Sequence, residues 1–149
     1  MTLRDPGSVV FPVLRVALDR AHLVAFARAT GQTDPRYLDL DAARAAGHPD
    51  VVAAPTYLFC LDRVPPARFS LVDELGIDLS RVLHGAQRFE YLADAHAGEH
   101  VEIRRAVVDH FSKKGGALEF VVQRSRVLRG AEPVAVLETT MIVRNEVDG

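Results

Sequence analysis

The chain has 149 residues, the size of one ordinary domain, so we expect a single domain spanning residues 1–149. Hydrophobic residues make up 48% of it and charged residues 26%, with a net charge of -2. This balance argues against a disordered chain and against a nucleic-acid-binding protein. The sequence has neither an apolar run long enough to cross a membrane nor the start of a secretory signal. We therefore expect no membrane partner and a cytoplasmic location.

The first part of the chain carries signals for a strand followed by two short helices. Strand-forming residues at 11–16 precede Asp19, which is suited to cap a helix over residues 20–30. Gly31 is placed to end that helix. In the same way, a second short helix over residues 42–46 would be capped by Asp39 or Asp41 and ended by Gly47.

A third helix is predicted to open at Pro55, because proline is favoured at the first helical position. The residues that follow, Tyr57 to Leu61, are apolar nearly all round, so this helix is predicted to be buried. The remainder of the chain reads as strands separated by glycine-containing turns, which predicts an antiparallel meander and an α+β architecture. The predicted strands are residues 88–92, 100–111, 118–128 and 134–144, with turns at Ala97-Gly98, Gly115-Gly116 and Arg129-Gly130.

Two blocks of the sequence resemble the MaoC-like dehydratase N-terminal family of FAS1-like dehydratase domains. The first block is residues 26–37, which read FARATGQTDPRY, followed by residues 41–47 and 52–58. The second is residues 83–91, which read LHGAQRFEY, followed by residues 97–99. The resemblance covers nearly the whole chain. It implies a hot-dog fold, in which an antiparallel β-sheet wraps around a central α-helix, and it implies that two such folds pair.

Active relatives carry a Gly-Asp-x-Asn-Pro-x-His signature, whose Asp and His activate water and handle protons at a 2-enoyl or 3-hydroxyacyl thioester. Against that signature, the chain keeps Gly31 and Pro35. Gln32 stands at the Asp position, Asp34 at the Asn position and Tyr37 at the His position. Glutamine cannot act as a carboxylate base, and tyrosine, with a reference pKa of about 10, is a poor proton shuttle near neutral pH. The resemblance thus implies a member without the usual catalytic pair.

Three ionisable residues remain candidates for a catalytic role. Asp34 is either a displaced general base or the first residue of an Asx turn before Pro35, and the turn is favoured. Tyr37 is either a hydrogen-bond donor to an acyl thioester or a half-buried aromatic residue, and both readings stay open. His84 precedes a strand near the predicted central helix and carries an imidazole, a common acid–base group, although a lone histidine is more often structural.

The substrate site implied by the resemblance lies at the start of the central helix. Backbone N–H groups at Ala54, Thr56 and Tyr57, beside Pro55, are expected to polarise a thioester carbonyl, with Gln32 across the cleft. No spacing among the histidines resembles a metal site, so neither a metal nor a cofactor is predicted. The histidines concerned are His22, His48, His96, His100 and His110.

The function predicted from these residues is that of a subunit of an (R)-specific 2-enoyl-thioester hydratase/3-hydroxyacyl-thioester dehydratase. In this reading the chain shapes the acyl tunnel, binds an acyl-CoA or acyl-carrier-protein thioester, and needs a second hot-dog subunit to supply Asp and His. Two alternatives stay open. One is a self-sufficient hydratase, or a thioesterase that uses a carboxylate such as Glu90. The other is a non-catalytic acyl-thioester-binding module.

Overall fold

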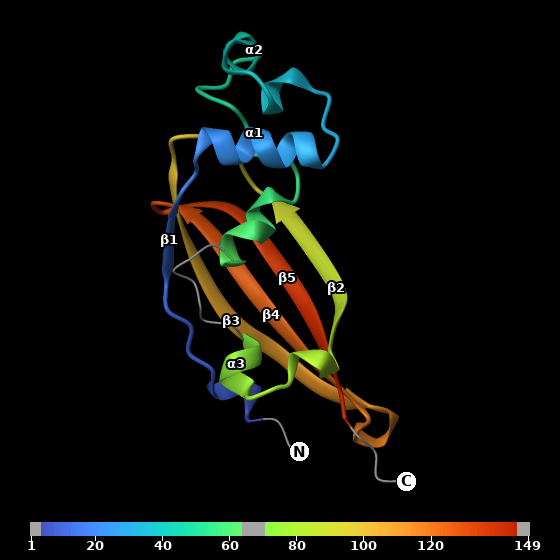
Figure 1. Cartoon of the computed structure of the whole chain (residues 1–149). Helices are drawn as coiled ribbons and strands as arrows, with labels where there is room; N and C mark the ends of the chain where they lie inside the picture. Colours follow the sequence, from blue (N-terminus) through green and yellow to red (C-terminus); the bar gives the residue numbers. More distant parts are fainter. Residues whose placement is uncertain (1–3, 64–70, 146–149) are drawn as a thin grey trace.

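The structure, a computed structural model, describes residues 4–63 and 71–145 (Figure 1). Within these residues lie five strands, three α-helices and five 3-10 segments. The strands and α-helices are β1 (Leu14–Ala17), α1 (Arg20–Ala29), α2 (Leu40–Ala45), α3 (Leu71–Leu75), β2 (Val82–Tyr91), β3 (His100–Lys113), β4 (Leu118–Arg129) and β5 (Glu132–Arg144). The 3-10 segments are η1 (Pro6–Ser8), η2 (Pro35–Tyr37), η3 (Tyr57–Arg63), η4 (Leu79–Arg81) and η5 (Lys114–Gly116).

All five strands form one antiparallel sheet in the order β1-β3-β4-β5-β2. The predicted meander is confirmed: β3, β4 and β5 follow one another, and glycines with positive φ turn the chain between them, Gly115 at 62° and Gly130 at 58°. The predicted first and second strands are shifted at their starts. β1 begins at Leu14 rather than at residue 11, and β2 begins at Val82, well before residue 88.

The first two helices are those that the sequence predicts. The carboxylate of Asp19 accepts the His22 N–H at 3.0 Å and caps α1, while Asp39, rather than Asp41, accepts the Ala42 N–H at 2.8 Å and caps α2. Gly31 adopts φ +74° just after α1, as a helix stop requires. Capping and stop residues predict these two helices correctly because each acts within a few residues of the helix that it begins or ends.

The third helix differs from the prediction. It begins at Tyr57 rather than Pro55, and it is the 3-10 helix η3 rather than an α-helix. Thr56 has φ +72°, a left-handed conformation that no helical residue adopts, so Pro55 and Thr56 form a turn before the helix. The predicted burial is confirmed: Tyr57, Leu58 and Leu61 each keep less than a tenth of their surface exposed.

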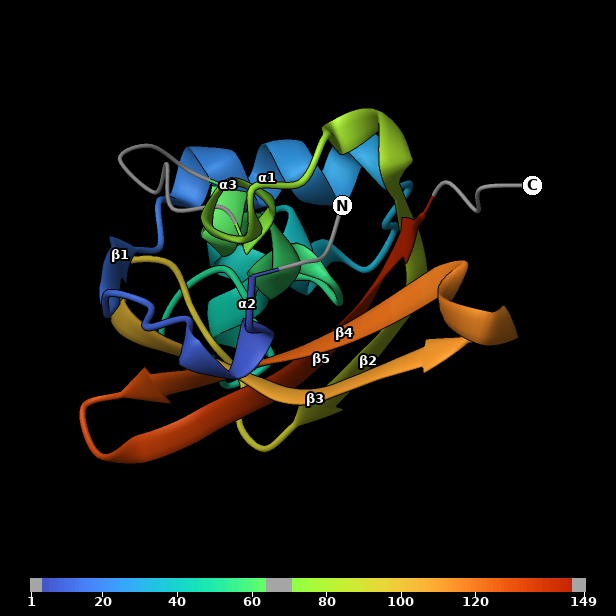
Figure 2. The same cartoon turned by 90° about the horizontal axis from the view of Figure 1, so that it is seen from below.

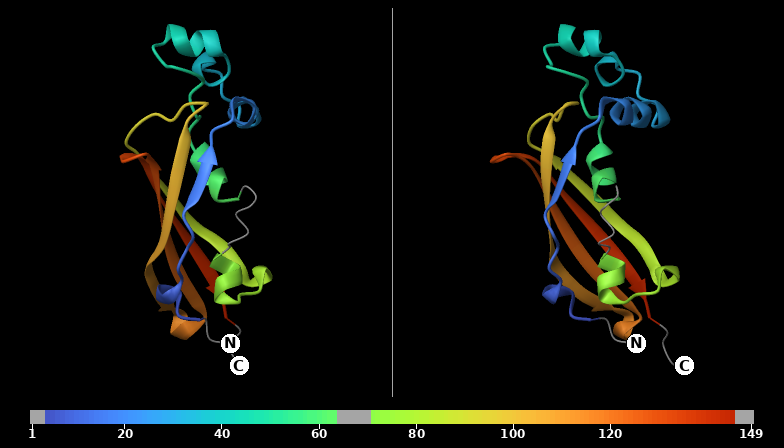
Figure 3. Two further views of the ribbon diagram at one scale, coloured as in Figure 1. Left: turned by 90° about the vertical axis from the view of Figure 1, so that its left-hand side faces the viewer. Right: turned by 60° about the vertical axis from the view of Figure 1, so that its left-hand side comes forward.

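One face of the sheet curves around the helices (Figures 2 and 3). Near α1, Leu58 and Leu61 of η3 pack against sheet residues such as Ile103, Val127 and Leu137. A second cluster lies at the opposite end, where Leu71 and Leu75 of α3 pack on β4 and β5. Figure 1 shows these two ends, with α1 and α2 at one and α3 at the other. No helix within the described residues is long and apolar enough to cross a membrane.

The edge strand β2 is bent by a bulge between His84 and Ala86, where Gly85 lies against β5. A Cβ atom added to Gly85 would come within 2.7 Å of Ile142 Cδ1 and 3.2 Å of the Thr140 carbonyl oxygen. Glycine is therefore needed here because of close approach to the neighbouring strand, although its φ is not positive.

We expect Gly85→Ala to lower the free energy of unfolding by about 1–3 kcal/mol, because a methyl group would be forced into filled space. Ile142→Ala removes the two atoms of Ile142 that the methyl group would meet. Urea denaturation of the two single variants and the double variant should therefore show that Gly85→Ala costs less when Ile142 is shortened. Additive costs would contradict this steric explanation.

Candidate functional site

The signature loop, residues 31–37 after α1, which resembles the catalytic signature in sequence, is held in a fixed backbone conformation. Gln32 N donates to the Ala27 carbonyl at 2.9 Å and so closes the end of α1. After it, Asp34 Oδ1 accepts the Arg36 N–H at 3.0 Å and caps η2. The favoured Asx turn at Asp34 is thus what the structure has. The Asp34 carboxylate thus makes two contacts with Arg36. Its Oδ1 accepts the backbone N–H, and its Oδ2 lies 3.0 Å from the guanidinium Nε.

Gln32 and Tyr37 flank this turn, and both are half-buried. The guanidinium of Arg36 lies over the ring of Tyr37, 4.9 Å from its centroid, so the ring packs beneath a cation. The Arg36 carbonyl accepts the Val52 N–H at 3.1 Å. This bond fixes the loop against the segment that leads into η3, which is where the resemblance places a thioester.

Two of the N–H groups expected to polarise a thioester carbonyl at the start of η3 are already paired. The Tyr57 N–H donates to the Ala54 carbonyl at 3.1 Å within the turn. The Thr56 N–H also has a partner. It donates to the Tyr91 hydroxyl at 2.8 Å. Tyr91 ends β2, is 49% exposed, and stacks on Phe89 with ring centroids 5.9 Å apart. Sequence reasoning missed Tyr91 because 35 residues separate it from Thr56 and only the folded sheet brings them together.

The other residues predicted at this helix start are enclosed to different degrees. Ala54 and Tyr57 are buried, whereas Pro55 and Thr56 are exposed. Burial raises the pKa of the Tyr57 hydroxyl, with smaller contributions from Cys60 and Asp19. Tyr57 therefore stays protonated across the physiological range, and its ring packs edge-on against Phe26 of α1.

His84 reaches the same helix at another point. Its ring lies 5.7 Å from that of Phe59, and its Nε2 is 3.2 Å from the Ala86 carbonyl oxygen, so that nitrogen carries the hydrogen. The signature loop contacts the segment before η3, whereas His84 contacts η3 itself through Phe59.

Glu90 lies on the opposite face of the sheet. Since Phe89 packs on the core, strand alternation puts Glu90 on the outer face. The outer-face residues around it are Arg88, Arg124, Arg126, Val136 and Glu138.

A polar network adjoins the loop that follows α2. His48 Nδ1 lies 3.1 Å from His96 Nε2, and His96 Nδ1 lies 3.0 Å from Glu99 Oε1. Arg129 donates to both Glu99 oxygens, at 2.7 and 2.8 Å. Burial alone would raise the pKa of Glu99, but hydrogen bonds from the His96 backbone, Arg129 and the His96 ring outweigh it and lower the pKa below its usual value.

One carboxylate oxygen of Asp94 lies within 4.8 Å of a ring nitrogen of His48 and of His96, so the fold brings together three groups that could hold a metal ion. Histidine spacing along the chain gave no sign of this, because residues 48 and 96 meet only when their segments pair. A bidentate ion pair from Arg20 to Asp50, at 2.8 and 2.6 Å, fixes the same loop to α1. The hydrogen bond from Arg20 lowers the pKa of Asp50.

Comparison with known proteins identifies the relatives of this chain. The FAS1-like, dehydratase domain region family matches residues 7–137. A UPF0336 protein of Leifsonia xyli subsp. xyli is 34% identical over 142 residues, which are 95% of this chain and 94% of that protein. The name of this relative states no activity, so it supports membership of a common family and not a particular reaction.

Two solved complexes from Mycobacterium tuberculosis contain chains with this fold. The C-terminally truncated HadBC (3R-hydroxyacyl-ACP dehydratase) complex gives a TM-score of 0.74 at 20% identity, covering 92% of this chain and 98% of the other. The ChsH1-ChsH2 complex gives 0.70 at 25% identity, covering 91% and 88%. The predicted hot-dog fold is confirmed by these likenesses. On the family match, the chain belongs to the FAS1-like, dehydratase domain region family, a MaoC-like family of hot-dog dehydratases and hydratases.

Proposed function

We propose that the chain is a single-domain subunit of an (R)-specific 2-enoyl-thioester hydratase/3-hydroxyacyl-thioester dehydratase that binds the acyl thioester and does not itself move the protons. The observation that carries this proposal is the composition of the signature loop. Gly31 and Pro35 keep its turn in place, while Gln32 and Tyr37 occupy the positions of the proton-handling residues. A second hot-dog subunit would supply Asp and His.

The other ionisable candidates are poorly suited to replace them. The Asp34 carboxylate accepts the Arg36 backbone N–H at 3.0 Å and lies 3.0 Å from the Arg36 guanidinium, so its oxygens are used within the turn. His84 points a nitrogen at a backbone carbonyl and lies against Phe59 rather than the loop. Glu90 faces away from η3, which disfavours a thioesterase that would use it. These contacts support the heteromeric reading over a self-sufficient enzyme.

The thioester is proposed to lie between the loop and the start of η3, with its carbonyl near Thr56. There the Tyr91 hydroxyl accepts the Thr56 N–H and retains its own hydrogen for donation. A hydroxyl that accepts one hydrogen bond donates a second more strongly, so Tyr91 would carry the polarising effect of the turn to the thioester oxygen. Phe59 and Phe89 lie beside it, edge-on to each other at 6.5 Å, and would form an apolar wall for the acyl chain.

Tyr91→Phe tests this placement. Loss of one hydrogen bond should weaken binding of a non-reactive acyl-CoA analogue by about 3- to 10-fold, because such a bond contributes about 0.5–1.5 kcal/mol. Isothermal titration calorimetry measures the change. Tyr37→Phe is the matched variant: if it weakened binding and Tyr91→Phe did not, the carbonyl would lie at the loop instead.

The second subunit is proposed to pair along β2. This strand lies at the sheet edge, so one row of its backbone groups faces no strand in the described part of the chain. Leu83, Tyr91 and Leu92 are exposed along the same edge, at 45%, 49% and 50%. Long apolar edges of this kind are usually covered in soluble proteins.

Without its partner, the chain is expected to form a homodimer through this edge at micromolar concentration. Leu83→Lys should shift light-scattering mass towards the monomer, because charge on an edge strand disfavours pairing. Val108→Lys, which changes a similarly exposed residue of the inner strand β3, should leave the dimer intact. A wild-type monomer, or equal effects of the two variants, would contradict pairing through β2.

Catalysis is tested with crotonyl-CoA, whose enoyl-thioester absorbance falls on hydration. Loss of one positioned acid or base typically costs about 10²- to 10⁴-fold, so the isolated chain should hydrate it hardly above background. A mixture with a MaoC-like chain that has the intact signature should be active. Robust hydration by this chain alone, abolished by Asp34→Ala or His84→Ala, would overturn the proposal. Gln32→Asp combined with Tyr37→His should raise activity if only the chemistry of the loop is missing.

A further inference from the structure

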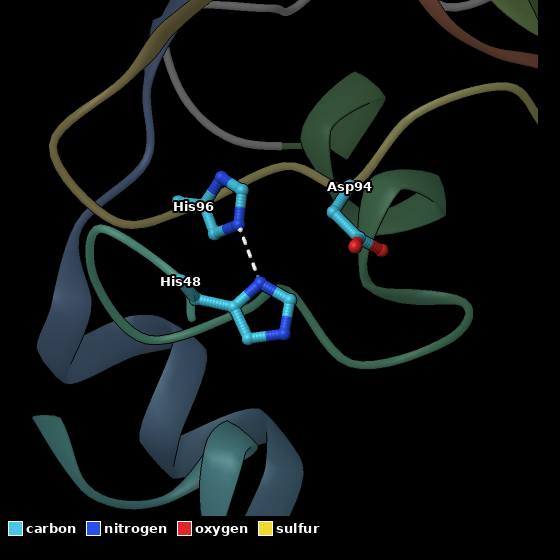
Figure 4. A group of neighbouring side chains, drawn as sticks. All are labelled: His48, Asp94 and His96. Carbon is cyan, nitrogen blue, oxygen red and sulfur yellow. Dashed lines mark hydrogen bonds between the residues drawn. The ribbon is translucent and has the colours of Figure 1, made fainter. Parts of the chain in front are cut away.

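His48 Nδ1 and His96 Nε2 lie 3.1 Å apart (Figure 4). The neighbours of His96 determine which of its ring nitrogens carries the hydrogen. Glu99 Oε2 accepts the His96 backbone N–H at 3.0 Å, and Oε1 lies 3.0 Å from His96 Nδ1. Because a carboxylate only accepts hydrogen bonds, His96 Nδ1 carries the hydrogen and Nε2 presents a lone pair. That lone pair points at Nδ1 of His48. The close approach is explained by an N–H···N hydrogen bond from His48 Nδ1 or, with a small rotation of the rings, by a metal ion that both nitrogens bind.

Asp94 provides a third donor at the same place. Its carboxylate lies beside the two rings in Figure 4, and one donor atom from each of His48, Asp94 and His96 lies within 4.8 Å of the others. Around a tetrahedral zinc ion with bonds of about 2.0–2.1 Å, donor atoms would be about 3.3 Å apart. The two ring nitrogens already have nearly that separation. Asp94 is exposed, so rotation of its side chain can bring the carboxylate in.

The backbone around these residues is held in place from several sides. Ala53 N donates to the Ala95 carbonyl at 2.8 Å and Ala97 N to the Val51 carbonyl at 2.9 Å, with Val52 and His96 forming a bridge between them. Arg129 donates to the Asp94 carbonyl at 3.0 Å as well as to Glu99. A site built on such paired segments needs little reorganisation when an ion binds.

We propose that His48, Asp94 and His96 form a binding site for a divalent transition-metal ion of the zinc class, with Glu99 orienting the ring of His96. A carboxylate that accepts the second ring N–H of a ligating histidine is a common feature of such sites. Two imidazoles and one carboxylate suit Zn²⁺ or Co²⁺ rather than Mg²⁺ or Ca²⁺, which prefer oxygen ligands. Three protein ligands leave a fourth position for water or an external ligand, the pattern of an open site rather than a closed structural one.

This site is independent of the proposed acyl-thioester function, because none of its residues belongs to the signature loop or to the turn before η3. The ion would join the loop after α2 to the segment before β3 across their side chains, in addition to the backbone bonds between them. Its occupancy can therefore be measured without any assay of hydration.

The test uses the full chain without a histidine tag, freed of metal by dialysis against EDTA and titrated with Co²⁺. We expect one equivalent to bind, with the visible absorption of tetrahedral Co²⁺, and Zn²⁺ to displace it. Glu99→Gln should weaken binding by about 10- to 100-fold, as for other groups that orient a ligating histidine. His22→Ala, at an exposed histidine of α1, should leave binding unchanged.

His48→Gln is the decisive variant, because the glutamine amide can still donate to His96 Nε2 but offers no imidazole ligand. It should keep the wild-type melting temperature without metal and lose metal binding by more than about 100-fold, a larger loss than that from Glu99→Gln. Absence of saturable Co²⁺ binding in the wild-type chain would overturn the proposal. Unchanged binding in His48→Gln would do the same, and either result would show that the rings form only an N–H···N hydrogen bond.

Discussion

The positions of the signature loop and of the turn before η3 depend on a short pairing between residues 51–53 and residues 95–97. These two segments lie outside the five-stranded sheet. Two backbone hydrogen bonds and the bridge between Val52 and His96 join the segment before η3 to the segment before β3. Val52 N also donates to the Arg36 carbonyl, so the signature loop is attached to the same place. Without this pairing, the loop, the turn at Thr56 and the His48–His96 pair would have no fixed positions relative to one another.

Packing makes that pairing possible. Val51 and Ala97 are both buried beside η3, so the hydrogen-bonded segments lie in an apolar environment where an unmade backbone bond would be costly. The Arg20–Asp50 and Arg129–Glu99 ion pairs bind the outer sides of the same segments to α1 and to β4. The family scaffold is therefore kept by backbone and core interactions, which are independent of the side chains at positions 32 and 37. This independence would allow the fold to keep its loop while the residues at positions 32 and 37 vary.

The sequence predicted those features whose causes are local. Asp19, Asp39 and Gly31 act on helices within a few residues of themselves, and the glycine turns at 115 and 130 determine where the meander reverses. The start of the central helix was mispredicted because Pro55 satisfies a local rule, while the left-handed turn at Thr56 is accompanied by a contact with Tyr91 from another element. The bond between His48 and His96 was missed for the same reason, since it depends on pairing between distant segments.

If the chain binds a thioester but lacks the residues that move protons, one NMR titration should show both properties. An ¹⁵N-labelled chain is mixed with crotonyl-CoA while the vinyl protons of the ligand are followed over time. We expect saturable shifts of the Thr56 amide resonance and vinyl signals that are lost only at about the uncatalysed rate. Rapid loss of the vinyl signals, or shifts that leave Thr56 and the loop at residues 31–37 unaffected, would contradict this expectation.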